Sequence, residues 1–163
     1  MVSYPVISKH RSSKLSGILL FIAMLLPGAP SYAIQLTDLL WKNRVLLLFA
    51  QDHQDQHLQQ TQYRLQQNNC DIKDRDIVIG IITNQGPDTL NNQSISRKYA
   101  ANLRKQFNIL NEQFVVILLG KDGSEKFRVL HLPDMNEIFA IIDGMPMRQD
   151  EMQASVTDCG KPN

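Results

Sequence analysis

The chain of 163 residues is 43% hydrophobic and 20% charged. This composition is ordinary for a globular protein, and the length suffices for one domain with a hydrophobic core. The formal net charge of +1 gives no electrostatic reason to expect a nucleic-acid partner.

Residues 1–33 have the pattern of a secretory signal peptide. A basic stretch, Lys9–Lys14, precedes the apolar run Leu15–Leu26, and Ser31 and Ala33 stand at small-residue cleavage positions. The apolar run is too short for a good membrane span, and an uncleaved amphiphilic anchor is the alternative interpretation. Removing the segment leaves 14 basic and 16 acidic side chains, a formal charge of −2. We therefore expect an exported protein, periplasmic or secreted, with no stable membrane span after cleavage.

Two apolar runs around a glutamine-rich segment predict a strand, a helix and a second strand. Arg44–Ala50 is almost continuously apolar, as in a strand covered on both faces. His53–Asn69 carries apolar residues at helical spacing on one narrow face, with Asp52 as a suitable N-cap. Asp76–Thr83 is rich in β-branched residues and follows a charged turn.

The next part of the chain predicts a loop, a helix and a hairpin. Asn84–Ser94 contains glycine, proline and several asparagines, which is typical of a loop. Ser94 is a suitable cap for a helix over Ile95–Phe107. Phe114–Gly120 is a third apolar strand, and the sequence KDGS then predicts a hairpin turn into Lys126–Leu132.

The helix over Ile95–Phe107 also carries a basic group, which we interpret as its solvated outer face. The members of this group are Arg97, Lys98, Arg104 and Lys105.

The last predicted helix begins at a capping box formed by Asp134 and Glu137. It ends or kinks near Gly144, because Pro146 has no N–H for a helical hydrogen bond.

The order of elements is therefore β-α-β-α-β-β-α. Two crossover helices between apolar strands imply a parallel pair with a neighbour, and the hairpin adds an antiparallel edge. The predicted fold is α/β and thioredoxin-like, with a four-stranded mixed sheet flanked by three helices. It occupies residues 34–153, followed by a polar C-terminal tail over 154–163.

Three stretches of sequence are similar to a known family: LLWKNRVLLLFA, LLGKDGSEKFR and IIDGMPMRQDEM. They resemble the bacterial DUDES-type domain family, also called domain of unknown function 4174, over most of residues 36–152. Relatives of this family occur as modules in secreted animal matrix and adhesion proteins. The resemblance implies a thioredoxin-like fold, loosely similar to peroxiredoxins, and an exported location. It implies no enzyme activity and transfers no catalytic residue.

Both parts of a thiol redox site are missing from the sequence. In a thiol oxidoreductase of this fold, the reactive cysteine sits at the N-terminus of the first helix, where the helix dipole stabilises the thiolate. Here that stretch is Gln51–Asp55 and contains no sulfur. The proline that faces the redox cysteines should lie within Asn108–Phe114, where none occurs. We therefore expect no disulfide reductase, isomerase or peroxidase of the usual kind.

A metal site is one alternative function. His53 and His57 are four residues apart on the predicted first helix, so their rings would share a face, with Asp52 and Asp55 beside them. Such nitrogen and oxygen donors suit zinc, nickel or copper. The same residues are equally typical of a solvent-exposed helix cap.

The two cysteines allow two interpretations. In an oxidising compartment, Cys70 and Cys159 are expected to form a structural disulfide, with two free thiols as the alternative. Their separation excludes a Cys-x-x-Cys redox pair, but an atypical redox protein using Cys70 remains a rival interpretation.

The C-terminal segment holds two further candidate groups. Met145, Met147 and Met152 provide thioethers that could bind Cu(I), although methionines are more commonly flexible packing residues.

Asp143, Arg148 and Glu151 form a candidate polar pocket, where an unknown hydrolase could work. The structural alternative is an ion pair of Asp143 with Arg148 that holds the proline-broken helix end. Trp41 is either an exposed binding aromatic or, more simply, a cover of the core beside the first strand.

The sequence thus favours an exported thioredoxin-like protein without thiol redox chemistry. It would bind a protein or another component of the cell envelope, and we expect no cofactor. The strand Lys126–Leu132, if its edge is uncovered, offers one route to a partner through strand addition.

Overall fold

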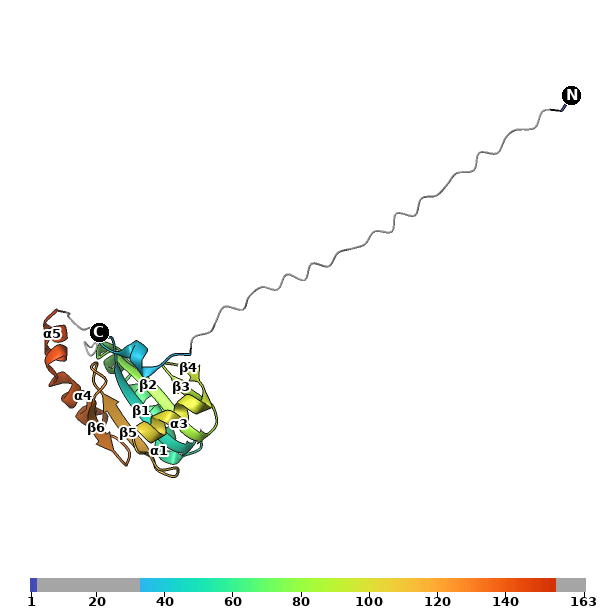
Figure 1. The fold of residues 1–163 in the computed structure, drawn as a ribbon. Helices are drawn as coiled ribbons and strands as arrows, with labels where there is room; N and C mark the ends of the chain where they lie inside the picture. Colours follow the sequence, from blue (N-terminus) through green and yellow to red (C-terminus); the bar gives the residue numbers. More distant parts are fainter. Residues whose placement is uncertain (3–32, 155–163) are drawn as a thin grey trace. The chain divides into compact units, whose positions relative to one another are not determined.

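The computed structural model describes residues 1–2 and 33–154, and its elements follow one another as drawn in Figure 1. In chain order they are η1 (Leu36–Leu39), β1 (Arg44–Asp52), α1 (Gln56–Gln67), α2 (Asn69–Asp74), β2 (Ile77–Gln85), β3 (Asp88–Leu90), β4 (Gln93–Ile95), α3 (Arg97–Gln106), β5 (Val115–Leu119), β6 (Glu125–Val129), α4 (Met135–Asp143) and α5 (Pro146–Ala154). The six strands form one mixed sheet in the order β4-β3-β2-β1-β5-β6. β1 and β2 are parallel, and the other neighbouring pairs are antiparallel.

β1 lies at the centre of the sheet and is buried on both faces, as its continuous apolar run predicts. Leu47 and Phe49 point to the core that α3 covers through Leu103. Leu46 and Leu48 point to the opposite core, which contains the inner faces of α1 and α4. Alternation along one strand therefore joins two hydrophobic cores through a single sheet.

The predicted α/β class is confirmed, but the four-stranded sheet is wrong because the predicted loop over residues 84–94 contains most of a hairpin. β3 and β4 pair through the two-residue turn Asn91-Asn92, whose φ angles are 51° and 58°. Both residues thus have the left-handed backbone of a type I′ turn, which asparagine adopts more readily than most residues. The hairpin extends the sheet beyond β2 by two short strands.

The helices also differ from the prediction. The charged turn before β2 forms α2, so the described residues contain five α-helices where three were expected. α1 begins after Asp55, whose carboxylate accepts a hydrogen bond from the Leu58 N–H, and Asp52 is not its cap. α3 begins after Ser96, whose hydroxyl accepts from the Tyr99 N–H, because Ser94 is part of β4.

The end of the chain follows the predicted break. α4 begins after Asp134 and ends at Asp143, with Gly144 as its C-cap and with Ile138, Phe139 and Ile142 buried. A further helix, α5, then starts at Pro146, where the missing N–H costs nothing. α5 includes Ala154, one residue past the predicted end of the domain.

None of the helices in residues 33–154 is long and apolar enough to cross a membrane. The predicted signal peptide lies outside the described residues except at its two ends, so the export prediction stays a prediction.

Candidate functional site

The position where thiol enzymes of this fold place their cysteine is here a polar turn between β1 and α1. The carboxylate of Asp52 accepts a hydrogen bond from the Gln54 N–H at 2.8 Å, and that of Asp55 caps α1. Both carboxylates therefore hold the local backbone. No cis peptide bond occurs in the described residues.

The two histidines of this turn do not share a helix face, and the prediction that they do is wrong. Because α1 begins only at Gln56, His53 lies before the helix, and its Nε2 is 2.8 Å from the Pro87 carbonyl oxygen. His57 lies on the helix and stacks on Phe114, with 5.3 Å between ring centroids. Within residues 33–154, no group of three His, Cys, Asp or Glu side chains is placed to hold a metal ion.

Behind the turn lies a buried arginine that the sequence analysis placed on a solvated face. Arg104 is only 7% exposed and donates hydrogen bonds to the carbonyl oxygens of Ala50, Ile82 and Leu110. Burial lowers the pKa of its guanidinium, partly offset by the charge of Asp88. The Arg104 guanidinium thus lies at this end of the sheet and binds backbone carbonyls. In a redox enzyme of this fold, the same end of the sheet holds the reactive group.

Cys70 lies on α2, away from the first turn of α1. Cys159 lies outside the described residues, so the disulfide between the two stays a prediction.

At the opposite end of β1, a network of ion pairs surrounds Arg44. Its guanidinium donates two hydrogen bonds to the carboxylate of Glu151, at 3.0 and 3.2 Å. The Lys121 ammonium lies 2.7 Å from the same carboxylate and 2.8 Å from that of Asp76. Burial raises the pKa of Glu151, but hydrogen bonds from Arg44 and Lys121 outweigh burial and lower it overall.

A second part of this network contains the predicted ion pair of Asp143 with Arg148. The Arg148 Nε is 3.2 Å from one Asp143 oxygen, and Arg75 Nη2 is 2.7 Å from the other. Arg148, which is 3% exposed, also pairs with the carboxylate of Asp74. Burial raises the pKa of Asp143, yet Arg75 and Arg148 together lower it below its ordinary value. Asp143, Arg148 and Glu151 do come together, but as structural ion pairs.

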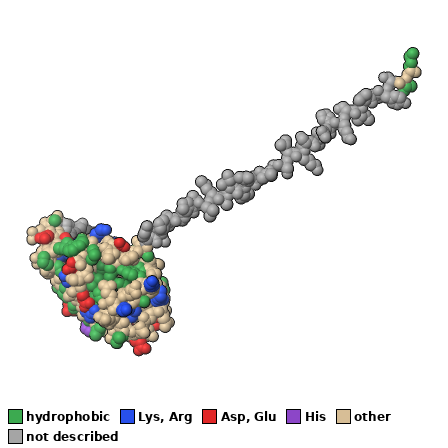
Figure 2. Space-filling model, in the orientation of Figure 1, with side chains coloured by type: hydrophobic (Ala, Val, Ile, Leu, Met, Phe, Trp, Pro, Cys, Tyr) green, Lys and Arg blue, Asp and Glu red, His purple; other side chains and the backbone are tan. Residues whose placement is uncertain are grey.

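Next to this network lies a pocket of about 670 Å³. It is open on a side of the molecule where Figure 2 shows hydrophobic side chains at the surface, near α4 and α5. Its lining residues are Trp41, Arg44, Gly120, Lys121, Asp122, Lys126, Ala140, Ile141, Gly144, Met145, Pro146 and Met147. None of the three residues of the predicted polar pocket belongs to this lining.

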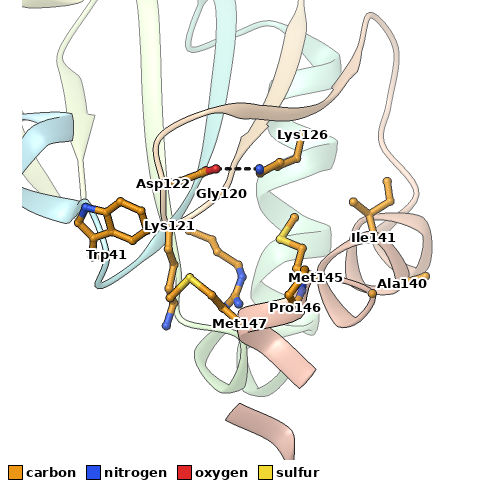
Figure 3. A pocket seen from close by; sticks show the side chains of 12 residues that line it. Trp41, Gly120, Lys121, Asp122, Lys126, Ala140, Ile141, Met145, Pro146 and Met147 are labelled. Atoms are coloured by element: carbon orange, nitrogen blue, oxygen red, sulfur yellow. Dashed lines mark hydrogen bonds and ion pairs between the residues drawn. The ribbon is translucent and has the colours of Figure 1, made fainter. Parts of the chain in front are cut away.

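The pocket has an apolar rim formed from distant parts of the sequence. In Figure 3, Trp41 stands on one side and Met145, Pro146 and Met147 on the other, with Lys121 between them. Trp41 is 67% exposed and Met147 is 41% exposed. Trp41 therefore does not cover the core, and two of the three clustered methionines line a cavity. Met152 lies further along α5 and is not among the lining residues.

Two features of the lining point to a binding role. Trp41 has a φ of 63°, a conformation that is costly for a bulky side chain, and its N–H donates to the Lys121 carbonyl oxygen at 2.7 Å. Arg44 is 1% exposed, and its Nε–H has no hydrogen-bond partner among the described residues. Strained backbone concentrates at functional sites, and the buried Arg44 guanidinium places a positive charge behind the pocket wall.

No sequence pattern marks this pocket as a unit. Trp41, Lys121 and Met147 belong to separate segments, and only the sheet order brings them together. The β1–α1 turn lies at the end of β1, whereas Met145, Pro146 and Met147 lie beside Arg44 at its start, so the two do not share a surface.

Comparison with known sequences identifies a family and a distant relative. The profile of DUF4174, a domain of unknown function, matches residues 35–151. The coiled-coil domain-containing protein 80 of Danio rerio is 27% identical over 128 residues. That alignment covers 69% of this chain and 15% of the zebrafish protein, so the chain spans a small part of this relative.

Comparison with solved structures finds peroxiredoxins. The reduced 2-Cys peroxiredoxin of Plasmodium vivax has a TM-score of 0.57 at 14% identity, covering 72% of this chain and 85% of the peroxiredoxin. The mitochondrial 2-Cys peroxiredoxin of Plasmodium falciparum has a TM-score of 0.53 at 11% identity, covering 78% and 87% respectively. At such identities the likeness shows the fold alone, and that fold is thioredoxin-like.

Proposed function

This chain belongs to the DUF4174 family of domains of unknown function, and from its site we infer that it is a binding module rather than a thiol enzyme. The observation that carries the proposal is the pocket rimmed by Trp41 and Met147. An exposed tryptophan and a flexible thioether beside a cavity provide adaptable contact area for a ligand. A volume of about 670 Å³ lies within the usual range of ligand pockets.

The chemistry of the two ends of the sheet supports binding over catalysis. The β1–α1 turn has no sulfur, and its carboxylates hold backbone N–H groups. At the other end, Asp143 has a lowered pKa because Arg75 and Arg148 hold it. A general acid needs a pKa near the working pH, so this carboxylate is poorly suited to the hydrolase alternative.

We further propose that the module acts outside the cytoplasm, on a protein or another component of the cell envelope. The support is the pattern of residues 1–33, a basic stretch followed by a short apolar run and a small-residue site. N-terminal sequencing of the protein from the producing cell tests this, and the expected mature chain starts at Ile34. An intact Met1 in a cytoplasmic fraction would contradict it.

Site-specific crosslinking in the producing cell tests the binding proposal. A photoreactive phenylalanine analogue replaces Met147 at the pocket rim, and in a control protein it replaces Tyr63, which is 64% exposed on α1. We expect light-dependent adducts from position 147, detected by intact mass and by gel shift, and none from position 63. Equal labelling from both positions, or no adduct from position 147, would rule against the pocket as the binding site.

A further inference from the structure

The pocket has an apolar part that needs a nonpolar occupant. Trp41, Met145 and Met147 enclose it together with Ile141, and Figure 3 shows these side chains around the open space. Trp41 and Met147 are among the most exposed large hydrophobic residues of the described chain. A ligand that covered them would remove apolar surface from water, which is the main driving force for binding in such pockets.

The other part of the pocket has cations and unused N–H donors. The lining includes the side chains of Arg44, Lys121 and Lys126, against one carboxylate, that of Asp122. Arg44 is only 1% exposed, so it contributes positive charge behind the pocket rather than a hydrogen bond to a ligand. The Lys121 ammonium has three N–H donors and contacts two carboxylates, so one donor is left for a ligand oxygen.

The surrounding charges limit how much negative charge a ligand can bring. Arg44 and Lys121 are already shared with Glu151, and Lys121 also pairs with Asp76, although neither carboxylate lines the pocket. Lys126 pairs with Asp122 at 2.9 Å, but both side chains are more than a third exposed, so this contact is easily exchanged. The pocket therefore suits a ligand with a single negative charge better than a phosphate monoester, which carries two.

Resting on the binding function proposed above, we propose that the pocket takes an amphipathic monocarboxylate. Its apolar body lies against Trp41 and Met147. Its carboxylate accepts hydrogen bonds from the ammonium groups of Lys121 and Lys126. Charge-assisted hydrogen bonds of this kind are the strong ones in ligand recognition.

Fluorescence of Trp41 gives a direct test, because it is the single tryptophan of the chain. The purified protein is titrated with octanoate, octanol and octyltrimethylammonium, which share one apolar body and differ in charge. We expect octanoate to shift the emission of Trp41 to shorter wavelength and to bind about tenfold more tightly than octanol. The cationic probe should bind most weakly.

Substitutions of the lysines separate the contribution of charge from that of pocket shape. Lys121→Gln and Lys126→Gln should each weaken octanoate binding about fivefold to tenfold. Octanol binding should not change in Lys126→Gln, because Lys126 pairs with Asp122 and not with Glu151 of α5, and this control shows that the pocket is intact. Lys98→Gln, an exposed lysine on α3, is the matched control and should bind both probes as the parent protein does.

The possible outcomes distinguish the carboxylate proposal from the proposed binding function. Equal affinity for octanoate and octanol would overturn the carboxylate proposal and leave an apolar binding pocket. If no probe bound but position 147 still formed crosslinks, the ligand class would be wrong and the binding function would stand. If no probe bound and position 147 formed no crosslinks, both the carboxylate proposal and the binding function would be wrong.

Discussion

Trp41 is both strained and exposed. Its φ of 63° lies in the left-handed region, which costs a residue other than glycine about 1–2 kcal/mol. With 67% of its surface exposed, the indole recovers little of this cost by burial. Without a ligand, Trp41 therefore lowers the stability of the folded protein. Such a cost is expected for a residue whose role is to bind a ligand.

We predict that Trp41→Gly raises the free energy of unfolding by about 1 kcal/mol, because glycine adopts a positive φ without strain. Binding at the pocket should be lost in the same variant. Urea denaturation followed by circular dichroism measures the stability, and Trp41→Phe is the matched control that keeps both an aromatic ring and the strain. A loss of more than about 1 kcal/mol in Trp41→Gly would show that the indole has a structural role.

Arg104 has the opposite character, because it is buried and both of its terminal nitrogens donate to backbone carbonyls. Its guanidinium binds three backbone carbonyls near the ends of β1 and β2 and after α3, so Arg104→Met leaves buried acceptors without donors. We expect the free energy of unfolding to fall by about 2–3 kcal/mol. The neighbouring Lys105→Met is the control, since Lys105 is exposed and should change stability by less than about 0.5 kcal/mol. Similar effects of the two substitutions in urea denaturation would contradict the structural role of Arg104.

At the scale of elements, α5 is held to the domain mainly by charge. Arg148 is the one buried residue of α5 among those described. The ion pairs of Arg148 and Glu151, with a hydrogen bond from Arg148 to the Asp74 carbonyl oxygen, join this helix to the body. Because Pro146 and Met147 of α5 line the pocket, the position of this helix decides whether the pocket exists. The ion pairs therefore contribute to the binding site by placing α5, and those of Glu151 also hold Arg44 and Lys121 at the pocket wall.

This dependence predicts that α5 detaches in acid. The pKa values of Asp143 and Glu151 are lowered in the folded protein, so both carboxylates stabilise it above their ordinary pKa values of about 4. That contribution is lost as the pH falls through the lowered values. We expect the amides of α5 to exchange with deuterium at pH 3 while those of β1 stay protected, after correction for the intrinsic rate.

A substitution should reproduce the acid effect at neutral pH. Arg148→Met leaves the buried carboxylate of Asp74 with only its longer contact to Arg75, at 3.6 Å, so we expect a loss of about 3 kcal/mol and early exchange in α5. Gln149→Met, at the exposed neighbouring position, is the control. Protected α5 amides in Arg148→Met would show that other contacts hold the helix.

The sequence predicted elements well where one physical signal dominates. The apolar run from Arg44 and the capping residue Asp134 mark their elements directly, because burial on both faces and N-capping each leave a local pattern. The β3–β4 hairpin was missed because its strands have three residues each, too few to show alternation. Arg104 was misplaced because charge suggested solvent, whereas its helical register places it beside the buried Leu103.

At the scale of the whole molecule, the fold and the site have separate origins. The thioredoxin-like sheet follows from strands and crossovers that are visible in the sequence, and the same sheet supports peroxiredoxins. The pocket depends on Trp41, Lys121 and Met147 meeting at the end of β1 where Arg44 lies. No local pattern marks such a meeting of distant segments, because side-chain contacts of this kind are fixed only by the packed fold.

A disulfide between Cys70 of α2 and Cys159 is expected to stabilise the exported protein. Cys70 and Cys159 are 89 positions apart, and a bridge that closes so long a loop removes much of the entropy of the unfolded chain, worth about 4 kcal/mol.

We expect the exported protein to show no titratable thiol until it is denatured and reduced. The double change Cys70→Ser/Cys159→Ser should lower the free energy of unfolding to the value of the reduced parent protein, and reductant should then have no further effect. Two thiols that react in the native, oxidised protein would show that the cysteines are unpaired and would reopen the atypical redox role of Cys70, because only a free thiolate can act as a nucleophile.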